Sequence, residues 1–383
     1  MKIWAILLFC LMVAGCESTP VLQAGETLFN DQLFATPSER ISTDDVFALS
    51  AEMRHYLSTE IEINLHGKSP QQALFDALYA KRQLKLEYES TMTRNAAQAF
   101  AARSGNCLSL VIMTAAFANE IGLPVQFQSV LGETVWSRSD DIYFSLAHVN
   151  IVLGKKRTEW RSAYDAQQSM TIDFLPPEEI RRQNVKVISE QTIVAMYMNN
   201  HAAEALAGGQ LDDAYWWARK AIERDPTLLS AYNTLGVIYR RHGNLPQAEQ
   251  TLTRALEHEP RSTLVMSNLI TVLNDLGRVA ESRTLRARLA QLESTPPFHY
   301  FNLGMDAMRA KNYQAAKTLF AKEVARDPYY HEFHFWLGIA HLRLGDLEQA
   351  GKEMRVAIDT SPTHDDRALY AAKLDRIKSY RRE

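Results

Sequence analysis

The stretch Ser104-Gly105-Asn106-Cys107-Leu108-Ser109-Leu110 opens an apolar run that continues to Ile121. This run predicts a buried helix that begins at Cys107, directly after the Gly-Asn turn. The first backbone N–H groups of a helix have no partner within it, and together with the helix dipole they favour a thiolate over a thiol. Cys107 is therefore a candidate nucleophile, provided that an imidazole and an orienting polar group lie beside it.

Two residues further along the chain are candidates for these partners. His148 lies in residues 147–153 and Asp173 in residues 171–174, and both segments are apolar and β-branched, as strands are. Before them, Gly122-Leu123-Pro124 ends the helix and residues 125–130 predict another strand. The expected order is a nucleophile at a helix start, a strand, a histidine on a strand and an aspartate on the next strand.

This order, with its flanking residues, resembles the transglutaminase-like superfamily. The resemblance covers roughly residues 96–177 and is most specific at Ser104 to Leu110, at Ile121-Gly122-Leu123-Pro124-Val125 and at His148-Val149. It implies an α+β, papain-like domain in which Cys107 is the nucleophile, His148 the base and Asp173 the residue that orients it, without a cofactor.

The chemistry that this resemblance implies is acyl transfer on an amide. A thiol protease or amidase is favoured, and a protein-crosslinking transglutaminase is the alternative within the same class. The backbone N–H of Cys107 would stabilise the oxyanion, and Gln98 and Asn106 are nearby polar candidates for a second donor.

The N-terminal residues have the pattern of an exported lipoprotein. An apolar run over residues 3–13 follows one positive charge, and small residues stand just before Cys16, as in signal peptides. The run Leu11-Met12-Val13-Ala14-Gly15-Cys16 resembles a bacterial lipobox, which implies removal of residues 1–15 and a lipid thioether on Cys16. Glu17 then favours the periplasmic face of the outer membrane, while an uncleaved anchor or an ordinary secretory signal remains open.

The cysteine count agrees with a nucleophilic role for Cys107. The chain has three cysteines, and Cys10 and Cys16 both lie in the leader. Cleavage and lipidation would leave Cys107 as the only free thiol of the mature protein. In an oxidising compartment a solitary thiol avoids forming a disulfide within the chain.

Between the leader and the cysteine turn, the pattern changes from tether to helix. Residues 16–39 mix Ser, Thr, Pro and Gly and predict a tether, and residues 40–190 form the expected catalytic domain. Its first part predicts a helix over residues 42–57, a helix from Ser69-Pro70, a short strand at 84–88 and a helix over 95–103.

A repeat governs the C-terminal half. Prolines 226, 260, 328 and 362 are spaced by 34, 68 and 34 residues. A period of 34 is typical of the tetratricopeptide repeat, a pair of antiparallel helices. One small position of each unit is occupied by Ala214, Ala248, Ala316 and Ala350, and the turn by Gly209, Gly243, Gly277 and Gly345.

We expect about five such units over residues 195–364, forming an all-α solenoid. The unit over residues 263–296 is degenerate, with Ser282 at the small position and Arg286 at an apolar one. A polar helix over residues 365–383 would cap the stack, because the last unit must not leave an apolar face open.

A repeat array of this kind predicts binding of a protein or peptide ligand in its groove. Tyr239, Trp336 and His341 are candidate groove residues, although aromatic residues at such spacings usually pack between helices. The cluster of His331, Glu332, His334 and His341 lacks the spacing that places two metal ligands on one helical face, so we predict no metal site.

Composition agrees with two globular parts and leaves one alternative function open. The formal net charge of −3 provides no basic field for nucleic acid, and no segment after the leader is predicted to cross a membrane. The alternative to an enzyme is a non-catalytic envelope adaptor that binds partners through its repeats. The oligomeric state cannot be deduced from these patterns.

The lipobox-like run makes the first testable prediction. Changing Cys16→Ser removes the thiol that would carry the lipid, so the variant should leave the membrane fraction or accumulate as an uncleaved precursor. Fractionation and mass determination of the N-terminus measure both. A processed, membrane-bound Cys16→Ser protein would contradict lipidation at this residue.

Overall fold

The structure is a computed structural model of the chain, and the part of it described below comprises residues 28–79, 84, 86–89, 92–131, 135–139, 142–146, 148–154, 169–174, 184–292, 295, 298–361 and 364–380. The predicted leader and lipidation site, with Cys10 and Cys16, lie outside the described residues. Within the described residues, no helix combines the length and the apolarity needed to cross a membrane.

The N-terminal half begins with a set of short helices. They are α1 Ala51–Tyr56, a π-helical turn η3 Leu57–Ile61, a 3-10 turn η4 Glu62–His66, α2 Pro70–Tyr79, α3 Ala96–Ala102 and α4 Cys107–Glu120. The first helix starts later than predicted, because the Ser50 hydroxyl caps it by accepting a hydrogen bond from the backbone N–H of Met53. The Ser42 hydroxyl instead accepts from the backbone N–H of Asp44 in a local turn.

A small mixed set of sheets accompanies these helices. The largest has the strand order β7-β6-β3-β8 and is antiparallel throughout, with β3 Val125–Leu131, β6 Val149–Leu153, β7 Met170–Ile172 and β8 Asn184–Ile188. Two further pairs are β1 Glu87–Tyr88 with β2 Ser104–Gly105, which are parallel, and β4 Val135–Ser139 with β5 Ile142–Leu146, which are antiparallel. The N-terminal half is therefore α+β, with the predicted strands at 125–130 and 147–153 both present.

Helix α4 is the centre of this half. Every residue from Leu108 to Ala118 is buried, so the helix has no solvent face over this length. A helix that is apolar on all sides requires neighbours on all sides. The sheet, the short helices and the first repeat helix provide them, and one continuous apolar core joins these elements.

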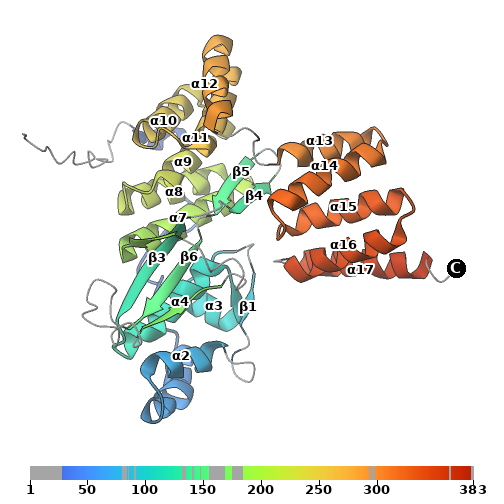
Figure 1. Cartoon of the computed structure of the whole chain (residues 1–383). Coiled ribbons are helices and arrows are strands. Elements are labelled where there is room, and N and C mark those ends of the chain that lie inside the picture. The colour runs from blue at the N-terminus through green and yellow to red at the C-terminus, as the bar shows by residue number, and fades with distance from the viewer. Residues whose placement is uncertain are drawn as a thin grey trace, which may run out of the picture.

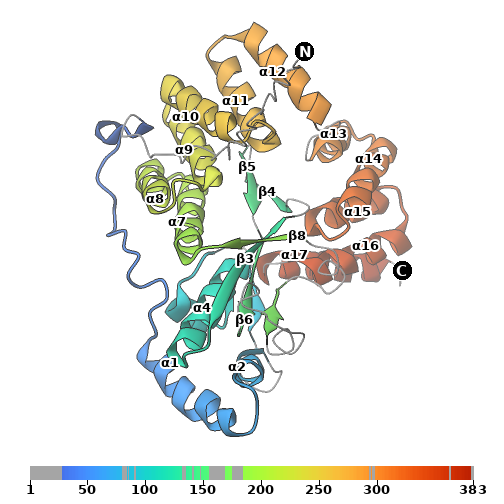
Figure 2. The ribbon, with the colours of Figure 1, turned by 60° about the vertical axis from the view of Figure 1, so that its left-hand side comes forward.

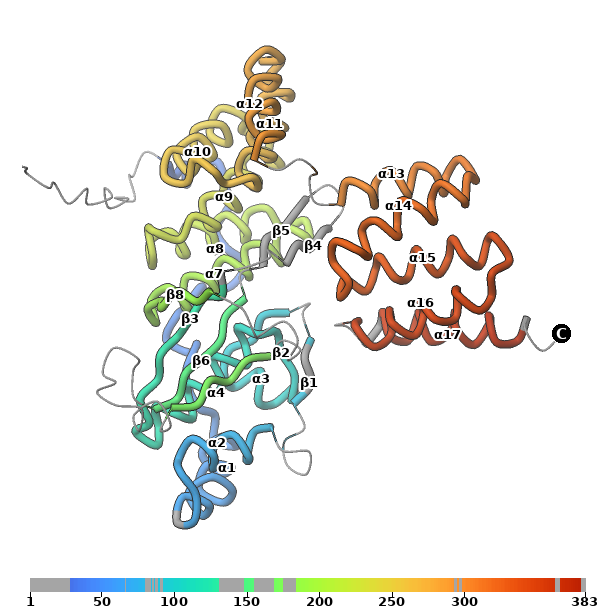
Figure 3. Tube along the Cα trace, viewed as in Figure 1, coloured from blue at the N-terminus to red at the C-terminus, as the bar shows by residue number. Residues whose placement is uncertain are grey.

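The C-terminal half consists of antiparallel helix pairs, as predicted. They are α7 Glu190–Ala207 with α8 Leu211–Arg224, α9 Leu229–His242 with α10 Leu245–His258, α11 Thr263–Asp275 with α12 Val279–Leu292, α13 His299–Arg309 with α14 Tyr313–Arg326, and α15 His331–Arg343 with α16 Leu347–Thr360, followed by α17 His364–Tyr380. Figures 1 and 3 show these pairs side by side along a curved array. Strand β8 ends at Ile188, and α7 begins two residues later, so the array follows the sheet without a linker.

The turn of each unit requires a left-handed residue. Gly209, Gly243, Gly277 and Gly345 all have positive φ values, between 75° and 89°. In the fourth unit the same position is Lys311, with φ of 59°, which a side chain with a Cβ adopts less readily. The repeat period thus continues through a unit in which the glycine signal is missing.

The array has a break after its third pair. The continuous core of the N-terminal half extends through the repeats as far as Leu273, whereas α13 to α15 form a separate cluster around Phe301 and Phe320. In the intervening helix α12, only Ser282 and Leu289 are buried. The degenerate third unit therefore has too little apolar surface to join the two parts of the array.

The described part of the predicted tether, residues 28–39, packs on the repeats and does not stand free. The Tyr239 hydroxyl donates to the carbonyl of Leu28 at 2.8 Å, and the Tyr215 hydroxyl donates to Asp31 at 2.7 Å. The ring of Phe34 stacks on Tyr215 with 3.9 Å between centroids. Figure 2 shows this dark-blue segment beside α8, from which the chain runs to α1. We call residues 28–38 the N-terminal strap.

The close approach of the two helices within each pair leads to a prediction about Gly236. A Cβ at this position would lie 2.5 Å from Cγ of Leu252, a fully buried side chain on the paired helix. We expect Gly236→Ala to lower the free energy of unfolding by about 1–3 kcal/mol, the usual effect of overpacking a core. Chemical denaturation followed by circular dichroism measures it.

Gly67→Ala is the matched control. Gly67 has φ of −124°, and no atom lies within 4 Å of an added Cβ. Its effect should stay within about 0.5 kcal/mol. Equal stabilities of the two variants would mean that the helices of this pair are not held at the described distance.

Candidate active site

The residue before Cys107 determines where helix α4 begins. Asn106 is its N-cap, and its side-chain oxygen accepts a hydrogen bond from the backbone N–H of Ser109 at 2.9 Å. Gly105 is required beside it, since a Cβ there would lie 2.7 Å from Cβ of Ser109. Cys107 is thereby the first residue of the helix, and it is partly exposed while the rest of the first turns is buried.

The structure brings Cys107, His148 and Asp173 together. Nε2 of His148 lies 2.7 Å from a carboxylate oxygen of Asp173, and both side chains are at least nine-tenths buried. His148 also lies close enough to Cys107 for the sulfur to raise the pKa of the imidazole. Because the aspartate engages Nε2, the other ring nitrogen, Nδ1, is the one left for the sulfur. This is the connectivity in which an imidazole passes a proton to or from a thiol while a carboxylate orients it.

The surroundings of His148 favour its protonated form. Burial by itself lowers the pKa of His148, but hydrogen bonds to Asp173 and Cys107 and the negative charges of both groups outweigh it and raise the pKa to about 9. An imidazolium at neutral pH is the partner that a thiolate requires. Because the pKa of His148 is higher in the folded than in the unfolded chain, protonation of this residue stabilises the fold. This contribution to the free energy of unfolding is complete below the unfolded-state pKa of about 6.5 and is lost as the pH rises through about 9.

One residue of the site was not singled out by sequence reasoning. Asn150, which is buried, donates from Nδ2 to the second carboxylate oxygen of Asp173 at 2.9 Å. It follows His148 by two residues, so both side chains leave the same face of the strand. This spacing of two residues in the sequence could have identified Asn150 as a neighbour of the site. Asn150 holds Asp173 in place while His148 uses the other oxygen.

Both side chains proposed as oxyanion donors take part in helix caps. Gln98 is exposed, and its side-chain oxygen accepts from the backbone N–H of Asn95 in the capping box of α3. The amide nitrogen of Asn106 donates to the hydroxyl of Thr93, and its oxygen caps α4. Gln98 is thus the third residue of α3 and completes its capping box, whereas Asn106 is the N-cap of α4. The backbone N–H of Cys107, at a helix start, remains the candidate donor.

The three groove candidates have different surroundings. Tyr239 is fully buried, because the N-terminal strap lies over its hydroxyl, so it does not line an open groove. Trp336 is partly buried among Phe320 and Phe335. His341 is bonded to Asp346, which follows in the next turn. Packing within the chain therefore accounts for all three side chains.

The other histidines of this region also have interhelical partners. His331 bonds the hydroxyl of Tyr370, and His334 bonds Glu353 and the carbonyl of Pro328. Among the described residues, no group of three potential ligands is arranged to hold a metal ion.

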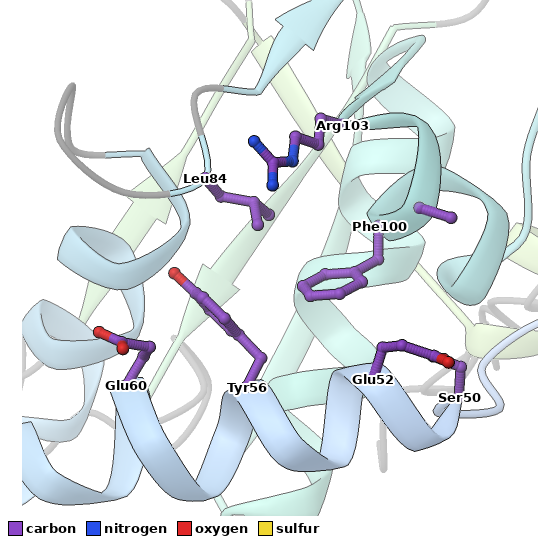
Figure 4. A pocket seen from close by; sticks show the side chains of 8 residues that line it. Ser50, Glu52, Tyr56, Glu60, Leu84, Phe100 and Arg103 are labelled. Atoms are coloured by element: carbon purple, nitrogen blue, oxygen red, sulfur yellow. The ribbon is translucent and has the colours of Figure 1, made fainter.

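A separate open pocket of about 410 Å³ lies on the face formed by α1, η3 and α3. Figure 4 shows Tyr56 and Phe100 on its floor, with Glu52, Glu60 and Arg103 around them. The three residues of the candidate site do not line it. Its Arg103 lies four positions before Cys107 and ends α3 in a left-handed conformation.

Known proteins resemble the repeat half of the chain. The family described as "Tetratricopeptide repeat" matches residues 217–250 and, in a second form, residues 301–365. The C-terminal half contains tetratricopeptide repeats. The predicted repeat is thereby confirmed, and no curated protein matched the chain.

Several solved structures are similar to the chain at the level of fold. YrrB, described as a TPR protein with an unusual peptide-binding site, is 24% identical over 47% of this chain and 92% of its own, with a TM-score of 0.26. Yeast Tom70 is 17% identical over 49% and 40%, with a TM-score of 0.35. PilF of Pseudomonas aeruginosa is 18% identical over 49% and 94%, with a TM-score of 0.29. These likenesses concern the fold alone.

The position of Cys107 at a helix start, beside His148, predicts thiol reactivity that depends on the histidine. A thiol with the ordinary cysteine pKa of about 8.5 is less than about 1% ionised at pH 6. Because His148 is protonated there, we expect iodoacetamide to alkylate Cys107 readily at pH 6. His148→Ala should lower the rate at pH 6 at least about tenfold and leave the rate at pH 9.5 nearly unchanged. Peptide mapping by mass spectrometry gives both rates.

Two further variants control this measurement. His341→Ala removes a histidine of the repeats and should not affect the rate. Asn150→Ala should give a smaller reduction than His148→Ala, because Asp173 stays in place with one partner fewer. A steep fall in the wild-type rate between pH 8.5 and 6, unaltered by His148→Ala, would show that the cysteine and histidine are not coupled.

Proposed function

We propose that the N-terminal half is a transglutaminase-like, papain-like catalytic domain that acts on amide bonds through Cys107. The supporting observation is the connected set of three side chains, with the sulfur on one side of the imidazole and the Asp173 carboxylate 2.7 Å from the other. The buried helix that begins at the cysteine supports the proposal, as do the antiparallel strands β6 and β7, because His148 directly precedes β6 and Asp173 directly follows β7.

The proposed reaction is a two-step acyl transfer. The Cys107 thiolate attacks the carbonyl carbon of an amide, and the backbone N–H at the helix start stabilises the oxyanion. The His148 imidazolium then gives its proton to the departing amine, and a thioester remains on the sulfur. A nucleophile that loses its proton to His148 resolves the thioester and regenerates the free enzyme.

Hydrolysis is the favoured second step. Water is present at about 55 M and competes with an amine unless the site excludes it. Cys107 is partly exposed, so water reaches the sulfur. The proposed activity is therefore that of a thiol protease or amidase, with transfer to an amine as the alternative outcome for the same thioester.

We assign protein or peptide binding to the repeat array. Tetratricopeptide repeats form a scaffold with no reactive group of their own, so chemistry belongs to the N-terminal half and recognition to the array. The lipobox-like run supports a position in the cell envelope, attached through Cys16. A lipid-anchored adaptor without turnover is the competing function, and it would use the same array.

Trapping the thioester tests the proposal. Full-length protein is incubated with casein, a flexible protein rich in glutamine, quenched in acid and analysed by intact-mass spectrometry. We expect an adduct on the wild type that hydroxylamine removes. His148→Ala and Asp173→Asn should form it at least about 100-fold more slowly, which is the usual contribution of general acid–base catalysis. Cys107→Ala should form none.

The second step is read from the same incubation. Release of small casein peptides or of ammonia indicates hydrolysis, and incorporation of a fluorescent primary amine into casein indicates transfer. An activity that persists in Cys107→Ala would contradict the assigned nucleophile. If no adduct forms on casein or on envelope proteins that the repeats retain, the adaptor function is the better account.

A further inference from the structure

The first repeat helix, α7, contacts the segment that precedes the cysteine helix. Thr93, which is buried, is the point of contact. Its backbone N–H donates to Oε1 of Glu204 at 2.7 Å, and its hydroxyl oxygen accepts from Nδ2 of Asn200 at 3.1 Å. Both partners lie on α7, one turn apart. Two independent hydrogen bonds thus tie one residue of the N-terminal half to the repeat array.

The same threonine holds the N-cap of α4. Its hydroxyl oxygen also accepts from Nδ2 of Asn106 at 2.9 Å, and the oxygen of that amide accepts from the hydroxyl of Ser109 at 2.8 Å as well as from its backbone N–H. Oγ of Ser109 in turn accepts from the backbone N–H of Arg94 at 2.8 Å. The residues on either side of Cys107, Asn106 and Ser109, are therefore both hydrogen bonded to residues 93–94.

The carboxylate of Glu204, on α7, is stabilised by the hydrogen bond that it accepts from Thr93. Burial raises the pKa of Glu204 to about 7, in spite of the hydrogen bond from Thr93 and the positive charge of Arg94, which lower it. Even a partly buried carboxylate loses solvation, which its hydrogen bonds must offset. Its neighbour His201 stacks on Trp217 at 4.7 Å between ring centroids, so packing fixes the same turn of the helix.

From these contacts we infer that Asn200 and Glu204 are positioning residues for Cys107, acting through Thr93 and Asn106. The repeat array thereby forms part of the active site, since its first helix holds the cap that places the sulfur beside His148. A protein ligand that displaces α7 relative to Thr93 would change the reactivity of the thiol. This inference rests on the proposed role of Cys107 as nucleophile.

Variants that differ in one atom group separate positioning from general stability. Thr93→Val removes the shared hydroxyl and preserves shape, whereas Thr93→Ser keeps the hydroxyl. Glu204→Ala removes the acceptor, and Glu204→Gln keeps an oxygen for the Thr93 N–H. Glu323→Ala is the control, because Glu323 is more deeply buried than the partly exposed Glu204 and also accepts from a backbone N–H, that of Tyr300, in a distant repeat.

Two measurements are made on each full-length variant. One is the pH profile of Cys107 alkylation by iodoacetamide, and the other is hydrogen exchange of the amides in the first turn of α4. Thr93→Val and Glu204→Ala should lower the alkylation rate at pH 6 by roughly two- to tenfold, the factor that one lost hydrogen bond corresponds to. The first turn of α4 should exchange faster in both. Thr93→Ser, Glu204→Gln and Glu323→Ala should behave as the wild type in both measurements.

The contrary results are equally distinct. Faster exchange at α4 with an unchanged alkylation profile would show that the cap does not position the sulfur, and would overturn the inference. So would a loss of reactivity in Glu323→Ala equal to that in Glu204→Ala, because the effect would then follow from general destabilisation. If Glu204→Ala does not fold, Asn200→Ala removes one donor from the partly exposed side of the contact and gives the same two readings.

These readings remain separate from the proposed reaction. Alkylation reports on the thiol whether or not an amide is turned over. Failure to trap a thioester on casein, with altered alkylation in Thr93→Val, would contradict the function and leave the coupling intact. A thioester that is trapped on Thr93→Val at the wild-type rate would support the proposed function and contradict the coupling.

Discussion

The amide of Asn106 is the contact on which the rest of this arrangement depends. Its oxygen caps the N-terminus of α4 by accepting a hydrogen bond from the backbone N–H of Ser109, and its nitrogen donates to the hydroxyl of Thr93. With both ends of the amide occupied, the helix can begin only at Cys107. The helix that follows is buried along its length, so its N-terminus is the place where a reactive group can meet a substrate.

The two halves of the molecule share one core up to the third repeat. Helix α7 follows β8 without a linker, contacts α4, and supplies the partners of Thr93. The solenoid rule, by which each repeat contacts only its neighbours, therefore fails at the first unit. Beyond α12 the rule applies again, because the apolar clusters of the last helices are separate from the main core.

The N-terminal strap packs on the surface of the first repeat helices. Phe34 stacks on Tyr215, and Asp31 accepts a hydrogen bond from the Tyr215 hydroxyl and forms an ion pair with Arg219, whose Nε lies 3.0 Å from the carboxylate. The strap thus joins the segment that precedes α1 to the repeat helices α8 and α9.

Local signals were sufficient for much of this protein. The 34-residue period identifies the helix pairs even where Lys311 replaces the turn glycine. Small residues recur at the position where the two helices of a pair approach each other closely, and this requirement arises within each pair. The turn before Cys107 and the strands around His148 and Asp173 are likewise set by short-range propensities. Those propensities, with the family resemblance, were enough to nominate the three residues that the structure brings together.

Tertiary structure decided what depends on contacts between distant segments. Gln98 and Asn106 are polar and close to the cysteine in the sequence, but only the structure shows that both side chains take part in helix caps. Tyr239 looked like a groove residue, but a strap more than two hundred positions away covers it. The bond between Thr93 and Glu204 has no local signal at all. Sequence periodicity records which face of an element is buried, whereas the identity of the group that buries it follows only from the folded chain.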